Sequence, residues 1–240
     1  MDTDTDVVVV GGGPAGLSCA VFTSRAGLDT VLVEDGDSIL RRNSHLENYL
    51  GFPAGVNSRQ LLEMGVDQVE RNGCRYLREE VQDASGTEDG FEVETENTEF
   101  VARFLVVASW SCLDYLDRLG LDTVEKGKTF VDTDSEGRTS VEDVYAAGRI
   151  AGNRHQAIVN AGDGANVGLT VIRDSETDFY HDWVAPKGYF TGRGREVPPG
   201  CEEITEEERK RREKESIEAM KEYFEEPRDD EPVMHPDVEK

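Results

Sequence analysis

The chain has 240 residues, and its 51 acidic residues outnumber the 26 basic ones, giving a formal net charge of −25 at pH 7. Because such a charge repels phosphate-rich surfaces, we expect neither nucleic acid nor an anionic membrane as a partner. No apolar run reaches membrane-spanning length, and the start Met1-Asp2-Thr3-Asp4 lacks the basic residues of a signal peptide. The four cysteines are not closely paired, which favours a reducing interior, so we predict a cytoplasmic location.

The acidic residues are not confined to one tail. Asp67, Glu79, Glu92 and Glu99 all lie within segments that are predicted to fold. Such a surface repels itself in dilute buffer, whereas at molar salt the Debye length falls to about 3 Å and the repulsion is screened. We therefore hypothesise a halophilic protein from a salt-accumulating cytoplasm. A disordered acidic tail is the simpler explanation only for the C-terminus.

The N-terminal stretch predicts a strand, a glycine-rich bend, a helix and a second strand in immediate succession. Asp6 to Val10 ends in an unbroken valine run, which favours a parallel strand buried on both faces. Gly11 to Gly16 follow at once, and Ala15 to Ser24 is helix-forming and apolar along one side. Thr30 to Val33 reads as a second strand, which Glu34 ends.

The glycines of this bend match the dinucleotide fingerprint position by position. Gly11 permits the tight turn, Gly13 lets the backbone approach a diphosphate, and Gly16 lets the helix pack against the strand. The helix that opens at Pro14 and Ala15 offers free N–H groups and a positive dipole end to the phosphates. Glu34 is positioned to accept hydrogen bonds from a ribose hydroxyl. A bland glycine-rich turn is the alternative.

The next segments extend this pattern into a βαβαβ unit. We predict a helix from Ser58 to Asn72, with Ser58 as its N-cap, and a third parallel strand from Cys74 to Leu77. Alternating apolar residues then predict a small antiparallel meander followed by a buried strand. The meander strands lie around Val81, at Phe91 to Thr95 and at Phe100 to Arg103, and the buried strand is Phe104 to Ala108.

Four motifs then occur together in order. They are the fingerprint with Pro14-Ala15-Gly16, the stretch Glu47-Asn48-Tyr49-x-Gly51-Phe52-Pro53, the pair Thr139-Ser140 with Val144-Tyr145-Ala146-Ala147-Gly148, and Gln156-Ala157 with Ala161-Gly162-Asp163-Gly164. Together they resemble the FAD domain of the thioredoxin reductase family, which is pyridine nucleotide-disulfide oxidoreductase-like, over roughly residues 6–175. The resemblance implies an α/β fold: a Rossmann-like, three-layer FAD-binding domain with a parallel sheet and a small antiparallel meander. It also implies FAD as cofactor.

The departures from this family are as informative as the match. The family places an NADPH-binding domain with a redox Cys-x-x-Cys between the two halves of its FAD domain. Here Val107-Ala108-Ser109 runs almost directly into Tyr115 to Leu121, which resembles the second half, so the nicotinamide domain looks excised at Trp110. The sequence contains neither a second glycine fingerprint nor a Cys-x-x-Cys. We therefore do not expect a self-contained thioredoxin reductase.

The resemblance also implies where the flavin contacts lie. Asn48 should run near the flavin ring, and the backbone at Val81 should meet adenine. Gly148 should form a tight turn against the flavin's linker. The helix opening at Gln156 and Ala157 should direct its N-terminus at flavin N1 and O2, where negative charge accumulates on reduction.

Two positions depart from the family's cofactor contacts. Arg149 stands where the family has an aspartate that hydrogen-bonds the ribityl chain. It could be turned to solvent, could pair with the diphosphate, or could weaken flavin binding. Ile39 replaces a glutamine that would contact FAD, and Arg41 or Arg42 either substitutes for it or forms ion pairs with nearby aspartates.

The weak candidates for catalytic residues are Cys112 and His155. His155 could supply a cation or a proton beside the flavin, or could be an exposed structural histidine. Cys19 and Cys74 read as core residues. Cys112 or Cys201 could exchange electrons with flavin as a solitary thiol, although nothing in the sequence lowers its pKa, which favours a structural role. We predict no metal site.

The domain plan follows from these segments. We expect an FAD-binding domain over 1–175 with its halves joined near 108–112, an irregular aromatic and Gly/Pro-rich loop over 176–203, a charged helix over 204–226, and a disordered acidic tail over 227–240.

Two expectations concern the residues after 175. Thr205 and Glu208 have the spacing of a helix capping box. Trp183, Tyr189 and Phe190 are expected to shield the flavin face that the missing domain would cover.

The leading functional hypothesis is a minimal single-domain FAD-dependent oxidoreductase that takes electrons from a separate redox protein or directly from substrate, and that forms a homodimer. One alternative is a non-catalytic flavin- or nucleotide-binding sensor or interaction module. A second is an enzyme like thiamine-thiazole synthase, against which the Glu47 to Pro53 stretch and the helix at Gln156-Ala157 argue.

Overall fold

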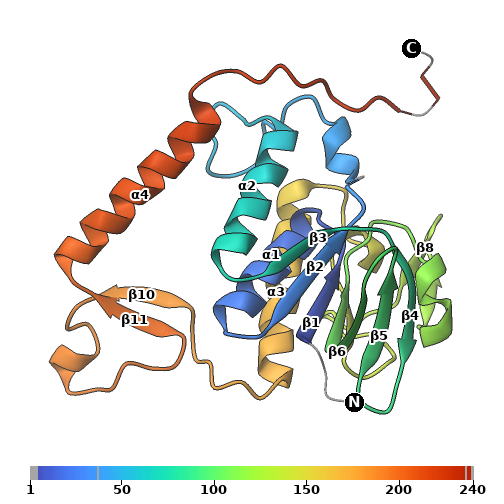
Figure 1. Cartoon of the computed structure of the whole chain (residues 1–240), viewed down its shortest axis with the longest axis horizontal. Helices are drawn as coiled ribbons and strands as arrows, with labels where there is room; N and C mark the ends of the chain where they lie inside the picture. Colours follow the sequence, from blue (N-terminus) through green and yellow to red (C-terminus); the bar gives the residue numbers. More distant parts are fainter. Residues whose placement is uncertain (1–4, 37, 236, 239–240) are drawn as a thin grey trace. The chain divides into compact units, whose positions relative to one another are not determined.

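The valine run near the N-terminus forms the middle of a sheet in the computed structural model, which describes residues 5–36, 38–235 and 237–238 (Figure 1). Val7, Val8 and Val9 of β1 (Thr5–Val10) have no exposed surface, as expected for a strand covered on both faces. The chain divides into two units, one comprising residues 1–175 with 231–240 and the other residues 176–230.

The main sheet of the first unit is mixed and mostly parallel in its centre. Its strand order is β3-β2-β1-β6-β5-β4, and β9 also pairs with β6. The parallel pairs are β2–β3, β1–β2, β1–β6 and β6–β9, whereas β4–β5 and β5–β6 are antiparallel. Besides β1, its strands are β2 (Thr30–Glu34), β3 (Arg75–Arg78), β4 (Val81–Gly86), β5 (Phe91–Thr95), β6 (Glu99–Val107) and β9 (Val144–Ala146).

The strand β6 corrects the sequence interpretation. Two strands were predicted, at Phe100 to Arg103 and Phe104 to Ala108, but a single nine-residue strand spans them because no turn residue separates them. Its first half pairs with β5 and its second half with β9, so one strand serves both the meander and the parallel sheet. The predicted α/β fold with a parallel sheet and a small meander is confirmed.

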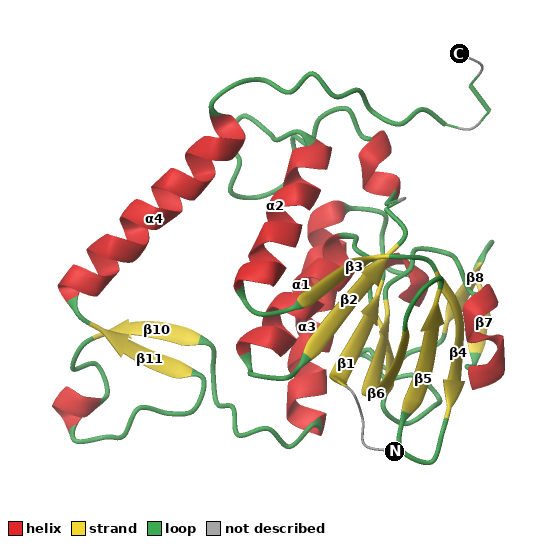
Figure 2. Cartoon of the chain, in the orientation of Figure 1, coloured by secondary structure: helices red, strands yellow, loops and turns green. Residues whose placement is uncertain are grey.

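Helices α1 (Pro14–Arg25) and α3 (Ala157–Asp174) lie side by side on one face of the sheet, with α2 (Ser58–Arg71) beside α1 (Figure 2). The N-cap of α2 is Asn57 rather than Ser58, since the Asn57 side chain accepts hydrogen bonds from the backbone N–H groups of Arg59 and Gln60. Ser58 is buried, and its hydroxyl instead donates to the backbone oxygen of Asn43 at 2.5 Å.

Shorter elements complete this unit. β7 (Thr123–Glu125) and β8 (Thr129–Val131) form an antiparallel pair. Short 3₁₀ helices occupy Ile39–Arg42, Asp114–Leu119 and Gly148–Ala151.

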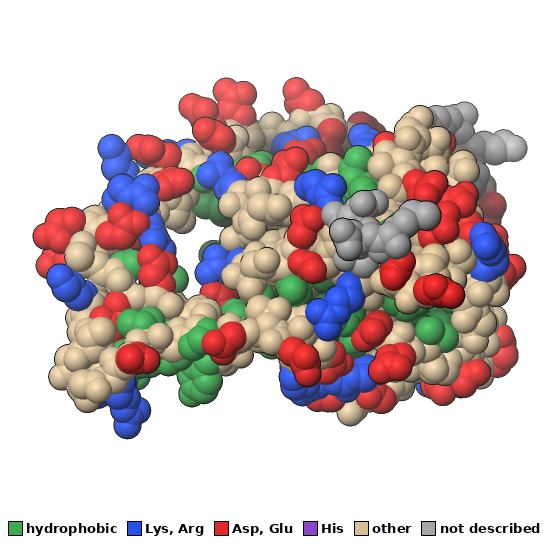
Figure 3. All heavy atoms as spheres, turned by 60° about the horizontal axis from the view of Figure 1, so that its bottom comes forward, with side chains coloured by type: hydrophobic (Ala, Val, Ile, Leu, Met, Phe, Trp, Pro, Cys, Tyr) green, Lys and Arg blue, Asp and Glu red, His purple; other side chains and the backbone are tan. Residues whose placement is uncertain are grey.

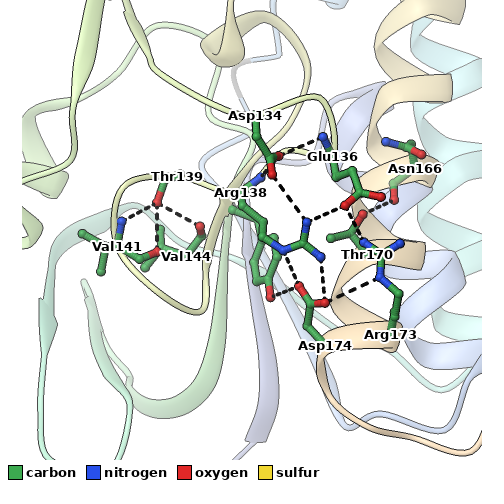
Figure 4. A network of polar contacts seen from close by, with 11 residues as sticks. Asp134, Glu136, Arg138, Thr139, Val141, Val144, Asn166, Thr170, Arg173 and Asp174 are labelled. Atoms are coloured by element: carbon green, nitrogen blue, oxygen red, sulfur yellow. Dashed lines mark hydrogen bonds and ion pairs between the residues drawn. The ribbon is translucent and has the colours of Figure 1, made fainter.

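A polar network fastens the C-terminal end of α3 to the turn before β9 (Figure 4). The guanidinium of Arg138 donates to both carboxylate oxygens of Asp174, at 2.7 and 2.8 Å, and also to Glu136 at 2.6 Å. The Tyr145 hydroxyl donates to Asp174 at 3.0 Å. These hydrogen bonds tie β9 and the turn before it to the C-terminal end of α3.

The second unit is more regular than the irregular loop expected over 176–203. β10 (Trp183–Pro186) and β11 (Cys201–Ile204) form a parallel pair, followed by α4 (Glu206–Phe224). The Glu203 carboxylate accepts hydrogen bonds from the backbone of Gly188, Phe190 and Thr191. Burial opposes its ionisation, but these hydrogen bonds outweigh that effect and lower the pKa of Glu203 to about 2.

Helix α4 begins after an N-cap at Thr205. The Thr205 hydroxyl accepts from the Glu208 backbone N–H at 3.2 Å, as the capping spacing predicts. Of the predicted tail, residues 227–235 contain no helix or strand, while 236 and 239–240 lie outside the described residues. Acidic side chains are scattered over the whole face drawn in Figure 3 rather than gathered in one patch.

Candidate functional site

The carboxyl ends of β1, β2, β6 and β9 meet at one edge of the sheet, because these strands run parallel. The chain leaves β1 toward β2 through α1, whereas β6 lies on the other side of β1, so this edge is a topological switch point. A cavity of about 850 Å³ opens here, within the size range of small-molecule sites.

The cavity gathers most of the residues singled out from the sequence. Its lining includes Gly11, Gly13, Pro14, Ala15, Glu34, Asn48, Val81, Cys112, Arg149, His155, Gln156 and Ala157. Gly16 and Gly148 do not line it but shape the backbone beside it. Segments far apart in the sequence are thus brought to one place.

The glycine bend after β1 is an open cradle. Gly11 has φ +111°, and a Cβ there would lie 2.5 Å from the Ala108 carbonyl oxygen, so only glycine fits. A Cβ on Gly16 would lie 1.9 Å from the Gly11 oxygen, which is how closely α1 packs on the bend. Gly13 gives α1 no side-chain cap, so the first N–H groups of α1 stay available for an anion.

Glu34, the last residue of β2, lines the cavity. Its side chain is buried, and it accepts a hydrogen bond from the Tyr76 hydroxyl at 2.5 Å. A Cβ on Gly12 would lie 2.3 Å from Glu34 Oε2, so the carboxylate lies directly over the bend. Burial, together with the hydrogen bond to Glu34, raises the pKa of Tyr76. The sequence did not predict Tyr76 as a site residue, because no local pattern pairs it with Glu34.

Asn48 and Gln156 also line the cavity. Asn48 Nδ2 donates to Gln156 Oε1 at 2.9 Å, although the two residues lie in separate motifs. Gln156 is the N-cap of α3 and makes no side-chain cap hydrogen bond, so the N-terminus of α3 faces the cavity uncapped. The sequence motifs predicted both positions, but not the bond between them.

The turn at Gly148 is fixed by Asp163. Gly148 has φ +79°, and its N–H donates to Asp163 Oδ2 at 2.6 Å. Burial raises the pKa of the Asp163 carboxyl, while the hydrogen bonds from Gly148 and Asn153 act in the opposite direction. Asp163 belongs to the fourth sequence motif, and in the structure its carboxylate anchors the turn at Gly148.

Arg149 is not turned freely into solvent. Its Nη1 donates to the Asn153 backbone oxygen at 2.8 Å, and its guanidinium lies 4.7 Å from the centre of the Phe130 ring. Half-buried in this way, it still lines the cavity.

His155 packs against Trp110, with ring centres 4.6 Å apart. Trp110 has φ +62°, an uncommon conformation for a bulky residue, and it was not singled out as a site residue. Burial, together with the positive charges of Arg149 and Lys128, lowers the pKa of His155 below its ordinary 6.5. The neutral form of His155 is therefore favoured more than in a free histidine, which argues against a standing cation in the cavity.

Cys112 lacks the environment of a reactive thiol. Burial raises the pKa of Cys112, and the negative charges of Asp114, Asp35 and Glu80 add to the effect, while a hydrogen bond with the Asp114 backbone opposes it. Cys112 is therefore a protonated thiol at neutral pH, unlike reactive cysteines whose pKa is depressed.

The buried cysteines are still less acidic. Cys19 has a pKa of about 12 and Cys74 of about 11, mainly because burial disfavours the thiolate.

Among residues 5–36, 38–235 and 237–238, no three His, Cys, Asp or Glu side chains are grouped so as to hold a metal ion. Over the same residues, no helix is both long and apolar enough to cross a membrane.

A parallel sheet with a glycine bend at its switch point, an acid at the end of the second strand and a cavity across both defines a Rossmann-like dinucleotide-binding domain. Residues 6–46 match the family model described as FAD binding domain. The thioredoxin reductase of Aquifex aeolicus (strain VF5) is 32% identical over 107 residues, which is 43% of this chain and 33% of that protein. That of Treponema pallidum (strain Nichols) is 28% identical over 170 residues, which is 69% of this chain and 51% of that protein.

The structural comparison agrees with the sequence matches. A thioredoxin reductase from Gloeobacter violaceus aligns with a TM-score of 0.69 at 20% identity, covering 75% of this chain and 98% of that one. The two sequence matches span about a third and about half of the length of the related reductases. The chain thus carries an FAD-binding domain related to thioredoxin reductases, and its fold is of the thioredoxin reductase type.

Proposed function

We propose that this chain binds FAD in the cavity at the sheet edge and acts as a minimal oxidoreductase that exchanges electrons with a separate redox protein or directly with substrate. The observation that carries the proposal is a single cavity lined by Glu34, by the bend from Gly11 to Ala15, and by Asn48 and Gln156. The strand order β2-β1-β6, with β9 on β6, gives this lining a path from Glu34 across the bend toward the start of α3. This path suits an extended dinucleotide with its diphosphate in the middle.

Each part of the cavity suits one part of the ligand. Glu34, held by Tyr76, accepts from the adenosine ribose, and the uncapped start of α1 holds the diphosphate. The uncapped start of α3 faces the redox-active ring, where its dipole favours negative charge. FAD, when bound, supplies the two-electron chemistry, while the protein positions the ring and sets its electrostatic surroundings.

The proposal assigns the electron donor to another molecule. The sequence has no second glycine fingerprint and no Cys-x-x-Cys, and Cys112 has a raised pKa. Neither a built-in nicotinamide site nor an internal dithiol is therefore part of the mechanism. The cytoplasmic, salt-rich setting and the homodimer expected from the sequence belong to the same proposal.

The first experiment is a titration of FAD into protein purified in high salt, followed by visible spectroscopy and calorimetry. We expect stoichiometric binding, and the bound protein should be reduced by photochemistry or by a ferredoxin-type donor but not by NADPH alone. A yellow protein that no donor reduces would instead favour the non-catalytic sensor. A protein that binds no flavin would remove the proposal.

Gly13→Asp is a variant that should keep the fold and lose FAD binding. A Cβ at Gly13 meets only Ser38 Oγ, at 3.7 Å, and Gly13 is the N-cap of α1, where aspartate is favourable. The variant should therefore fold at least as well as the wild type. Its carboxylate would occupy the phosphate position, so FAD binding should be lost.

A further inference from the structure

A residue that lines the cavity carries a buried acceptor without a donor among the described residues. Asn160, in the first turn of α3, is 8% exposed and lines the cavity, and its Oδ1 accepts no hydrogen bond from any residue that the structure describes. Its Nδ2 donates to the Gln156 backbone oxygen at 3.0 Å. Because a carbonyl can only accept, this bond fixes which way the amide points and leaves Oδ1 as the open acceptor. An unsatisfied buried acceptor is costly, so its presence indicates a ligand that donates.

The neighbours of Asn160 fix its place along the ligand. A Cβ built on Gly148 would lie 2.7 Å from the Ala15 side chain and 3.7 Å from Asn160 Oδ1. Asn160 therefore lies beside the first turn of α1, where the phosphates are expected to bind. It lies on the side of β1 that carries β6 and β9, whereas Glu34 lies at the end of β2.

The chemistry of the ligand then narrows the donor. A dinucleotide whose adenosine ribose meets Glu34 crosses the bend with its diphosphate and continues toward Asn160. Phosphate oxygens only accept at neutral pH, so the diphosphate cannot satisfy Oδ1. The next group in FAD is the ribityl chain, an open polyol with several hydroxyl donors.

Arg149 cannot serve these hydroxyls as an acceptor. A guanidinium has donors only, and that of Arg149 is engaged with the Asn153 carbonyl and the Phe130 ring. An acceptor for a hydroxyl in this part of the cavity must come from another residue, and Asn160 supplies one.

We propose that Asn160 Oδ1 accepts a hydrogen bond from a ribityl hydroxyl of FAD and thereby makes this site select a ligand with a polyol next to its diphosphate. The assignment rests on the proposed FAD binding. It makes Asn160 a specificity-determining residue of the cavity that takes over the acceptor role at the linker, where the chain has Arg149.

The test compares FAD with ADP, which keeps the adenosine and diphosphate but has no ribityl chain. Asn160→Leu removes the open acceptor with little change in volume, and Asn160→Ala is the second variant should the first fold poorly. Both should bind FAD about tenfold more weakly, the loss expected for one buried hydrogen bond, and should bind ADP as the wild type does. Because Asn160→Leu also removes an unsatisfied buried acceptor, its melting temperature without ligand should stay level or rise. Asn166→Leu, at an exposed position on the same helix, is the control and should change neither affinity.

An FAD analogue with deoxygenated ribityl positions gives the ligand side of the cycle. The wild type should bind the analogue that lacks the contacted hydroxyl about as weakly as Asn160→Leu binds FAD. Asn160→Leu should bind that analogue and FAD with the same affinity, because the hydrogen bond is already absent. FAD affinity unchanged in both Asn160 variants, or reduced equally for FAD and ADP, overturns the assignment while leaving FAD binding in place. A wild type that binds ADP but no FAD removes the proposed function together with the assignment.

Discussion

Asn48 Nδ2 donates to Gln156 Oε1 at 2.9 Å, a bond that joins the loop after β2 to the N-cap of α3 across 108 positions of sequence. Both side chains line the cavity. The Gln156 side chain accepts this bond and makes no cap hydrogen bond to α3, so the first N–H groups of α3 remain available to a ligand.

The first prediction concerns this pair. Asn48→Ala and Gln156→Ala should each weaken FAD binding by about three- to tenfold, since each removes one hydrogen-bonding partner near the ring. The double variant should lose little more than either single one, because the two residues act as a unit. Calorimetric titration of the four proteins measures the coupling.

Thermal unfolding serves as the control for the pair. The bond is solvent-exposed, so the variants should lose less than about 0.5 kcal/mol of stability. Additive losses of affinity would show that the two side chains contact the ligand independently.

The second prediction uses two glycines of α3. A Cβ on Gly164 would lie 2.0 Å from the Ala15 carbonyl oxygen, whereas a Cβ on Gly162 would meet nothing within 4 Å. Gly164→Ala should therefore push α1 and α3 apart and lower the free energy of unfolding by about 3 kcal/mol or more. Gly162→Ala should raise it by up to about 1 kcal/mol, because alanine favours the helix. Denaturant unfolding monitored by circular dichroism measures both, and equal effects would contradict the packing described for α1 and α3.

The third prediction concerns the protonation of His155. Its pKa is lowered by burial first and by Arg149 second, so an NMR titration of its ring protons should give a midpoint below 6.5. Arg149→Met should move that midpoint upward, but burial should keep it below 6.5. The unfolded chain binds this proton more readily, so His155 should reduce stability as pH falls below about 6.5. A wild-type midpoint at or above 6.5 would contradict the environment described for this ring.

Much of the site could be predicted because its constraints are local. The bend at Gly11 requires a positive φ, and Gly16 packs on the bend backbone five residues later, so a short motif records both. The valine run of β1 and the acid at Glu34 follow the same logic. Such features locate the bend, and with it the proposed diphosphate site, without knowledge of the tertiary structure.

The remainder depends on contacts that no local pattern encodes. Tyr76 meets Glu34 from β3, and Trp110 adopts a left-handed backbone beside His155. Asn160 reads from the sequence as one more polar residue on a helix. Only its burial and its unmatched oxygen in the fold distinguish it.

Secondary structure shows the same division. The cap of α2 was placed at Ser58, although Asn57 is equally good capping chemistry and leaves the Ser58 hydroxyl for Asn43. The loop over 176–203, predicted to be irregular, contains β10 and most of β11. Glu203 accepts hydrogen bonds from the N–H groups of Gly188 and Thr191, and glycine and proline content does not encode such contacts.

The fourth prediction concerns salt. A formal charge of −25, with acidic side chains scattered over the face in Figure 3, should make the folded chain repel itself at low ionic strength. Raising KCl from about 0.1 M to about 2 M shortens the Debye length from about 10 Å to below 3 Å, so the melting temperature should rise. A melting temperature that is the same in dilute and multimolar KCl would remove the argument for a salt-rich cell interior.

The fifth prediction concerns Arg138, which binds both Asp174 and Glu136 (Figure 4). Arg138→Met should cost about 1 to 2 kcal/mol of stability at pH 7, since Asp174 loses both hydrogen bonds from the guanidinium and keeps the one from Tyr145. Glu136 loses one donor and keeps its pair with Arg173. Arg118→Met is the control, because Arg118 forms a single exposed pair with Asp83 and its loss should cost about 0.5 kcal/mol or less. Urea unfolding at fixed salt measures both.

The pH dependence of Arg138→Met separates the network from simple packing. The hydrogen bonds from Arg138 lower the pKa of Asp174 below its ordinary 3.8, so its contribution is present above that value and is lost as pH falls through the lowered pKa. The wild type and Arg138→Met should therefore differ in stability at pH 7 and converge well below pH 4. The difference should also persist in about 2 M KCl, because short bidentate hydrogen bonds are screened less than exposed charges. A gap between the two proteins that stayed constant down to pH 2 would assign the loss to the packing of the Arg138 side chain instead.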